Sequence, residues 1–175
     1  MNLIARMTTL FLMLLVTSCG WHLRGHNSQL TAIESVHISA ANRQSQLVEI
    51  LKRQLIANDI TVEENASDAR YGIVILDQRG SRRVATINTS ARVSEYRLVE
   101  EVDVVILDSS GKNVLPSTTL SSEKVYEFDE DNVHAKDDEA NLLKTEMHHA
   151  LVRQILARLR LISTKAAGGN DATES

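Results

Sequence analysis

The chain has 175 residues, a formal net charge of −4 and only 3% aromatic residues. A net acidic chain so poor in aromatic side chains lacks the basic field and the stacking platforms of nucleic-acid-binding proteins, so we expect no nucleic-acid partner. The length suits one domain with a real core, and the single cysteine excludes an intrachain disulfide.

The first 18 residues have the form of a cleavable export signal. The apolar run at 7–16 is shorter than the roughly 20 residues that span a bilayer, and small residues separate it from Cys19. This ending resembles the lipobox of bacterial lipoproteins, in which the cysteine becomes the acylated N-terminus. Gly20 replaces the aspartate that favours inner-membrane retention, so we expect a lipidated tether over residues 19–32, anchored in the periplasmic leaflet of the outer membrane. The alternative is that Cys19 is a buried thiol behind an ordinary leader.

The next segments predict a strand, a helix and two further strands. Alternation over residues 34–39 predicts a short strand, and helical spacing of leucines predicts a helix with Asn42 as its N-cap and an end at Asn58 and Asp59. The segment "ITVEE" at residues 60–64 predicts either a brief strand or the lead into the next one. Residues 70–80 have a nearly continuous apolar centre, which is typical of a strand covered on both faces.

Two more strands follow, at residues 93–107 and 119–131. In the first, even-numbered apolar residues share one face, and Glu100 interrupts that face without an evident reason. The segment around Gly111 predicts the turn between the two strands, and Pro116 lies at the entry of the second, where a missing N–H does least harm.

The last element is an amphipathic helix whose first turn contains the acidic residues 137–139 and whose apolar stripe runs from Leu143 to Ile162. The polar segment 163–175 is expected to be disordered. The order of elements predicts a single α+β domain over residues 33–162. We expect a two-layer sandwich with a mostly antiparallel four-stranded sheet and both helices on one face, which leaves the other face for a partner.

Motifs for catalysis and for metal binding are absent from the sequence. There is no nucleophile elbow, zinc-protease helix, phosphate loop or dinucleotide fingerprint. His148 and His149 are adjacent and point in different directions on a helix, and His22 and His26 have no third ligand nearby. We therefore expect no enzyme activity, no cofactor and no metal site.

One basic segment stands out against the acidic background. It contains five arginines and a single acid, Glu95; the arginines are Arg79, Arg82, Arg83, Arg92 and Arg97. The β-prone residues between them predict that two strands extend into a protruding hairpin. Guanidinium groups bind phosphate in bidentate geometry, so the cluster would suit a phosphorylated lipid. The alternative, of equal weight on spacing alone, is that the arginines are solvated or pair with Glu100, Glu101 and Asp103.

Three short segments carry a family resemblance. They are "CGWHLRG" at residues 19–25, "SEYRL" at 94–98 and "AKDDEANLL" at 135–143. Together with the order of elements, they resemble the LptE family of lipopolysaccharide (LPS)-assembly lipoproteins, from Cys19 to about Ile162. The resemblance implies a non-enzymatic protein that plugs an outer-membrane β-barrel, LptD, as a 1:1 heterodimer, helps the barrel to assemble, and takes part in inserting LPS into the outer leaflet.

The resemblance also implies candidate LPS contacts. Lys136 matches the lysine of the family's Ala-Lys-Asp-x-Glu segment, which is linked to LPS binding. A second basic position of the family falls on Thr89 here, and Arg92 and Arg83 are the candidate substitutes. We expect LPS to contact Lys136 and the five arginines.

Two rival classes remain at this stage. A tethered binding lipoprotein, with peptidoglycan or another barrel as its partner, would share the lipobox and the α+β body without LPS specificity. A lipoprotein hydrolase would need a nucleophile motif that the sequence lacks.

Overall fold

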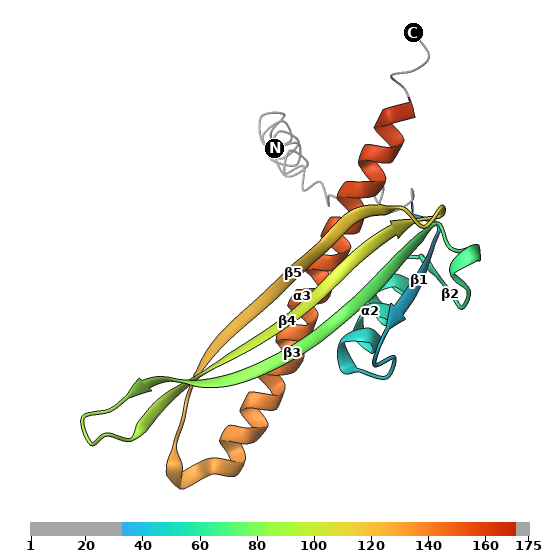
Figure 1. Ribbon diagram of the computed structural model, residues 1–175. Helices are drawn as coiled ribbons and strands as arrows, with labels where there is room; N and C mark the ends of the chain where they lie inside the picture. The colour runs from blue at the N-terminus through green and yellow to red at the C-terminus, as the bar shows by residue number, and fades with distance from the viewer. Residues whose placement is uncertain (1–32, 171–175) are drawn as a thin grey trace, which may run out of the picture.

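The computed structural model describes residues 33–170, with side chains through residue 166. Cys19, the leader and the tether therefore lie outside the described residues, as do residues 171–175. The elements follow one another (Figure 1) as β1 (Ser35–Ala40), α2 (Gln46–Ile56), β2 (Thr61–Glu63), η1 (Ala66–Asp68), β3 (Tyr71–Ile87), β4 (Val93–Asp108), β5 (Asn113–Glu127), η2 (Glu130–Asn132) and α3 (Val133–Asn170).

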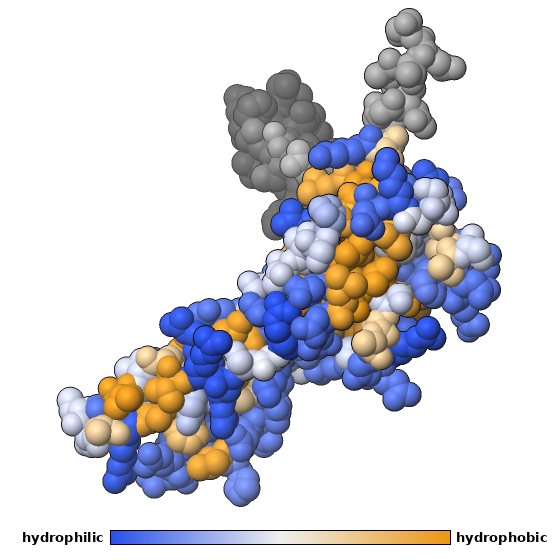
Figure 2. All heavy atoms as spheres, viewed as in Figure 1, coloured by the Kyte–Doolittle hydropathy of each residue, from blue (hydrophilic) through white to orange (hydrophobic). Residues whose placement is uncertain are grey.

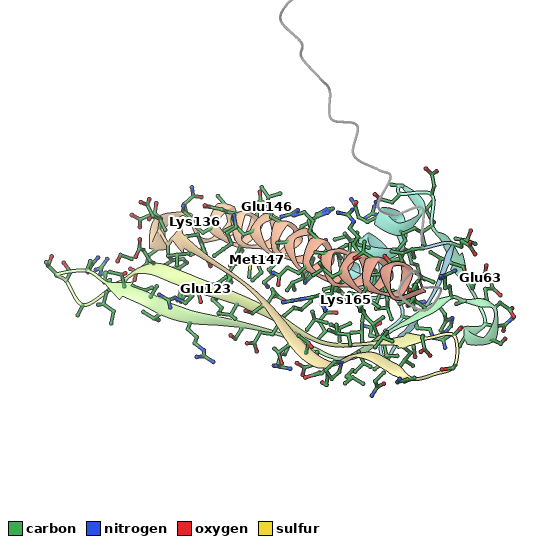
Figure 3. The ribbon with its side chains drawn as sticks, turned by 90° about the horizontal axis from the view of Figure 1, so that it is seen from above. Glu63, Glu123, Lys136, Glu146, Met147 and Lys165 are labelled. Atoms are coloured by element: carbon green, nitrogen blue, oxygen red, sulfur yellow. The ribbon has the colours of Figure 1, made fainter. Side chains whose placement is uncertain are left out.

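The strands form one five-stranded sheet in the order β2-β1-β3-β4-β5. The long strands β3, β4 and β5 are antiparallel, whereas β1 pairs in parallel with both β2 and β3. Both helices lie on the same side of this sheet (Figure 3), which confirms the α+β two-layer sandwich. The sheet has five strands and not four, because the brief strand at residues 61–63 pairs beside β1.

The main core lies between the helices and the half of the sheet that contains β1. Leucine and isoleucine side chains of α2, such as Leu47, Leu51 and Leu55, are fully buried there against Ile73 of β3. Burial of each such side chain contributes roughly 1.5–3 kcal/mol. We call this end of the molecule, with β1, β2 and the β4–β5 turn, the proximal half.

The expectation that β3 is covered on both faces is wrong. Ile73 and Ile75 face the helices and are buried, but Leu76 is 51% exposed. A β-bulge between Ile75 and Asp77 shifts the register with β4 at this point. Both helices cover one side of the sheet, so the apolar run of β3 has only one protected face.

Three predicted boundaries are also corrected. Helix α2 begins after Ser45, whose Oγ accepts from the Val48 N–H, so Asn42 is not the N-cap. Helix α3 begins earlier than expected and continues to Asn170, so the segment from residue 163 is helical and not disordered as far as the structure describes it. Ser163 is buried, and its hydroxyl donates a hydrogen bond to the backbone carbonyl of Arg160. This bond satisfies the buried hydroxyl within the helix itself.

A second, smaller core lies farther along the same three strands. Leu98, Tyr126, Ala140 and Met147 form it, with Tyr96 and Leu143 packed beside them. We call this part the distal arm; it comprises residues 81–99, residues 123–132 and the first turns of α3. No helix within the described range is both long enough and apolar enough to cross a membrane.

Candidate functional site

The distal arm ends in a hairpin that extends beyond the start of α3 (Figure 1), as the sequence predicts. Asn88 organises its turn: its backbone pairs with Arg92 and Ala91, and its Oδ1 accepts from the N–H groups of Ser90 and Arg92. Ala91 adopts a positive φ of 60°, a conformation that is unusual for a residue with a Cβ. The turn is thus held by one asparagine side chain.

The strand register divides the candidate cations between two sides of the sheet. Arg82 pairs with the buried Leu98 and therefore points to the helix side, whereas Arg83 pairs with Arg97 on the uncovered face. Arg79, opposite Glu101, also lies on the uncovered face. The structure therefore does not bring the predicted cations together in one patch.

On the uncovered face, Arg79 is the centre of a network of carboxylates that we call the outer-face ion network. Its guanidinium donates to Glu101 at 2.9 Å, Asp77 at 3.1 Å and Asp103 at 2.6 Å. Hydrogen bonds from Arg79 and Thr119 hold the pKa of Asp103 below its ordinary value of 3.8. The hydrogen bonds to the three carboxylates, of which the one to Asp103 has the largest effect, raise the pKa of Arg79. The network crosses from β3 to β5, so it joins three strands.

Arg83 and Arg97 are a same-sign pair directly opposite each other. Arg97 turns to Glu123 of β5, with Nε and Oε1 3.2 Å apart. Arg83 has no ion pair with any acid in the described part of the chain. Like charges opposite each other destabilise a sheet, so Arg83 is the arginine of this face that an external anion would satisfy best.

The remaining three candidates, Arg82, Arg92 and Lys136, lie where the hairpin meets η2 and the start of α3, and we call them the junction cations. Each pairs with an acid from that segment: Arg82 with Asp137 at 3.3 Å, Arg92 with Glu130 at 3.3 Å and Lys136 with Glu139 at 2.9 Å. The Glu139 contact raises the pKa of Lys136.

Arg82 is the junction cation that contacts the aromatic residues of the arm. Its guanidinium carbon lies 4.6 Å from the centroid of the Tyr96 ring, and it donates to the Tyr126 hydroxyl at 3.4 Å. That hydrogen bond raises the pKa of Arg82. Tyr96 in turn meets Phe128 edge to face, with centroids 5.0 Å apart. The aromatic residues of the arm therefore support a cation rather than a nucleic-acid base.

These contacts decide between the two interpretations of the basic segment for most of its residues. Arg79 pairs with Glu101 and Asp103 across the strands, as the second interpretation expects. Glu100, the third acid expected to pair with them, has no arginine partner. An anion that binds the junction cations must replace carboxylates that already occupy them.

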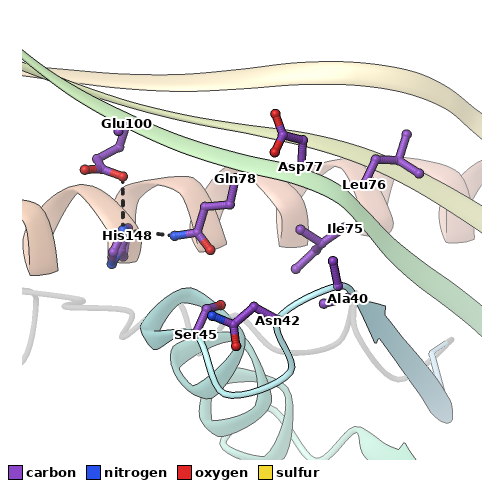
Figure 4. A pocket seen from close by; sticks show the side chains of 11 residues that line it. Ala40, Asn42, Ser45, Ile75, Leu76, Asp77, Gln78, Glu100 and His148 are labelled. Carbon is purple, nitrogen blue, oxygen red and sulfur yellow. Dashed lines mark hydrogen bonds and ion pairs between the residues drawn. The ribbon is translucent and has the colours of Figure 1, made fainter.

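Glu100 instead belongs to a buried polar layer between the two cores (Figure 4). Glu100 and His148 are each 7% exposed, and His148 Nε2 lies 3.3 Å from both Glu100 Oε2 and Gln78 Nε2. On the other side of the ring, His148 Nδ1 lies 3.0 Å from Gln46 Oε1 and therefore carries the proton. The other ring nitrogen, Nε2, thus faces both the Gln78 amide and the Glu100 carboxylate.

The polar layer explains why Glu100 interrupts the apolar face of β4, and a glycine on the neighbouring strand makes space for it. Gly80 is opposite Glu100, and a Cβ at this position would lie 2.9 Å from the Glu100 carboxyl carbon. Glycine at position 80 thus leaves the space that the Glu100 carboxylate occupies on its way to His148. A cavity of about 360 Å³ lies beside the layer, between the end of β1 and the bulge of β3. Within residues 33–166, no three metal-ligating side chains come together.

Comparison with known proteins identifies relatives along most of the chain. Residues 33–159 match the family model described as LptE, lipopolysaccharide-assembly. A protein of Photorhabdus laumondii, named LPS-assembly lipoprotein LptE, is 22% identical over 157 residues, which cover 88% of this chain and 85% of that protein.

Solved structures share the fold. The rare lipoprotein B of Shewanella oneidensis superposes with a TM-score of 0.69 at 17% identity, over 77% of this chain and 99% of that one. Lipoprotein B of Nitrosomonas europaea gives a TM-score of 0.66 at 23% identity, over 81% and 89% of the two chains. The two-layer sandwich is therefore common to all three proteins.

Proposed function

Because the chain belongs to the LptE lipopolysaccharide-assembly family, we propose that it is an outer-membrane lipoprotein that plugs and helps to assemble an LptD barrel. Acylated Cys19 anchors it in the periplasmic leaflet, and the complex is a 1:1 heterodimer. In that complex it takes part in the insertion of LPS into the outer leaflet. We expect it to act without catalytic chemistry and without a cofactor.

The observation that carries the proposal is the family match over residues 33–159. The uncovered sheet face supports it physically. Figure 2 shows this face, with hydrophobic residues gathered near β1 and at the hairpin tip and hydrophilic residues between them. The lumen of a large membrane barrel is polar. Charged groups that are already internally paired, such as the outer-face ion network, enter such a lumen at a lower desolvation cost than unpaired ones.

LPS would be bound by the junction cations and by Arg83. Phosphate oxygens accept the same charge-assisted hydrogen bonds as the carboxylates of Glu130, Asp137 and Glu139 that now occupy the junction. When a phosphate of LPS replaces one of these carboxylates, the cation has an anionic partner both before and after the replacement. Arg83 needs no exchange, because it has no pair among the described acids.

The first test is purification of the tagged full-length protein from outer membranes, followed by identification of the chains that co-elute. We expect an LptD barrel in stoichiometric amount. Recovery of acylated protein without a barrel would contradict the plug function. Recovery with peptidoglycan or with a different barrel would favour the tethered binding lipoprotein instead.

The second test separates LPS binding from general attraction by positive charge. We expect Lys136→Ala to weaken binding of LPS by the acylated protein, and Arg92→Glu to weaken it further. Lys144→Ala is the matched control, because Lys144 lies two turns along α3 and has the same charge and intermediate exposure as Lys136. Equal losses in Lys136→Ala and Lys144→Ala would mean that binding reports overall charge only.

A further inference from the structure

A groove at the proximal end of the molecule is basic and apolar at once. It has a volume of about 530 Å³ and lies between the β4–β5 turn, the start of β5 and the last described turns of α3. We call it the proximal groove. Its lining consists of Lys112, Asn113, Val114, Leu115, Arg158, Leu161, Ile162, Lys165 and Ala166, which include three cations and no acid.

The side-chain cations of this region differ from most of those of the distal arm in making no ion pair with a described acid; the carboxylate of Asp108 accepts from the backbone N–H of Lys112. Residues 147–166 of α3 contain no aspartate or glutamate, although they carry four cations, Arg153, Arg158, Arg160 and Lys165. Neither these four nor Lys112 makes an ion pair with an acid in residues 33–166, whereas every candidate LPS-binding cation except Arg83 does. Three of these cations without an ion pair, Lys112, Arg158 and Lys165, line the proximal groove.

The helix dipole does not account for these cations. Cations stabilise a helix within its last turn, but α3 continues to Asn170, so Arg158 lies about three turns before the end. Leu161, between Arg158 and Lys165 on the same face, is 56% exposed. Cations that flank an exposed leucine on one helix face are typical of helices that lie on a membrane surface.

The position of the groove relative to the tether points to the same partner. Ile33, where the described chain begins, is buried at the proximal end, and α3 extends past the sheet at this end (Figure 1; Lys165 is labelled in Figure 3). The segment 19–32 spans at most about 50 Å when fully extended. An anchor at Cys19 therefore keeps the proximal groove within reach of the bilayer and leaves the distal arm farther away.

We propose that the proximal groove is a membrane-docking surface, in which Lys112, Arg158 and Lys165 bind anionic phospholipid head groups of the anchoring leaflet and Leu161 enters their interface. The inference rests on the proposed acyl anchor at Cys19. It assigns the two ends of the molecule to different lipids: the distal arm to LPS and the proximal groove to phospholipid. Each surface cation near an anionic bilayer strengthens binding about fivefold.

The test uses the acylated full-length protein in vesicles of phosphatidylethanolamine and phosphatidylglycerol, with neutral phosphatidylcholine vesicles for comparison. Because the only natural cysteine is acylated, Ala166→Cys supplies a unique thiol for a fluorophore at the groove, and Ser90→Cys supplies one at the hairpin tip. We expect iodide quenching at position 166 to fall on the anionic vesicles and to stay unchanged on the neutral ones. Quenching at position 90 should not change. High salt screens the attraction to the vesicles, so it should restore iodide quenching at position 166.

A charge-matched pair of variants tests the residues themselves. Arg158→Glu/Lys165→Glu should abolish the protection of position 166, whereas Arg43→Glu/Arg53→Glu, which changes net charge equally at exposed positions elsewhere, should keep it. Flotation of the protein with the vesicles separates the two proposals. If no variant floats, the anchor is wrong and the inference falls with it. If the protein floats but position 166 stays open to iodide, or is equally protected on neutral vesicles, only the docking surface is overturned.

Discussion

In the proximal half, one continuous cluster of 21 buried residues joins both helices to the sheet, whereas the distal arm is held by a cluster of four and by surface ion pairs. The same three strands run through both regions, so the difference lies in what covers them. Apolar burial contributes far more stability than exposed ion pairs, which typically contribute 0.2–1 kcal/mol each. The proximal half therefore stabilises the fold, and the arm is free to exchange its pairs for those of a ligand.

The largest expected effect contrasts one leucine from each core. Leu151 is fully buried in the main core, and Leu98 is almost fully buried in the arm. We expect Leu151→Ala to lower the free energy of unfolding by about 2–5 kcal/mol, and Leu98→Ala to lie at the low end of that range because the arm can collapse around the loss. Denaturant unfolding measures both. A larger loss for Leu98→Ala would refute the ranking of the two regions.

The next effect concerns the polar layer that separates the two cores. Glu100→Leu leaves the buried His148 without its carboxylate partner, so we expect a loss of about 1–3 kcal/mol in the free energy of unfolding. The double variant Glu100→Leu/His148→Leu should recover most of this loss, because an apolar pair would join the main core to the arm. Additive losses in the double variant would show that the two side chains act independently.

A smaller effect distinguishes the two neighbouring arginines of the arm. Arg82→Met removes the contact with the Tyr96 ring. We expect the free energy of unfolding to fall by about 0.5–1 kcal/mol and amide hydrogen exchange in the arm to become faster. Arg83→Met is the control, because Arg83 points to the other face and has no described ion pair. Equal effects of the two substitutions would mean that Arg82 contributes only as a charge.

The helices and the long strands could be predicted because periodicity reports which face of an element is buried. The apolar stripe of α3 and the even-numbered apolar residues of β4 gave the right faces and the right layer order. The end of α3 could not be read in the same way, because small and polar residues such as Ser163 carry no apolar stripe. Beyond the stripe, the helix is held by its own hydrogen bonds.

The candidate site was predicted in composition but not in arrangement. A one-residue step along a strand reverses the face, so the neighbours Arg82 and Arg83 lie on opposite sides of the sheet. The acids that pair with the junction cations are up to 55 residues away in the chain. The one available signal for the polar layer was Glu100 itself, a carboxylate at an apolar position. The other members of the layer, Gln46, Gln78 and His148, come from α2, β3 and α3.

The smallest effect is the response of the outer-face ion network to acid. Because Arg79 and Thr119 hold the pKa of Asp103 below 3.8, the ionised carboxylate is favoured in the folded state. Its contribution to stability is full above that ordinary value and is lost as the pH falls through the lower folded pKa. Asp103→Asn should therefore flatten the fall in melting temperature below about pH 4, and Arg79→Met should flatten it equally, since hydrogen bonding from Arg79 is the main cause of the shift. Melting curves from neutral to acidic pH would measure this, and the double variant should show no further change. If Arg79→Met left the acid response of the wild type intact, Asp103 would owe its pKa to Thr119, and β3 would not be coupled to β5 through this network.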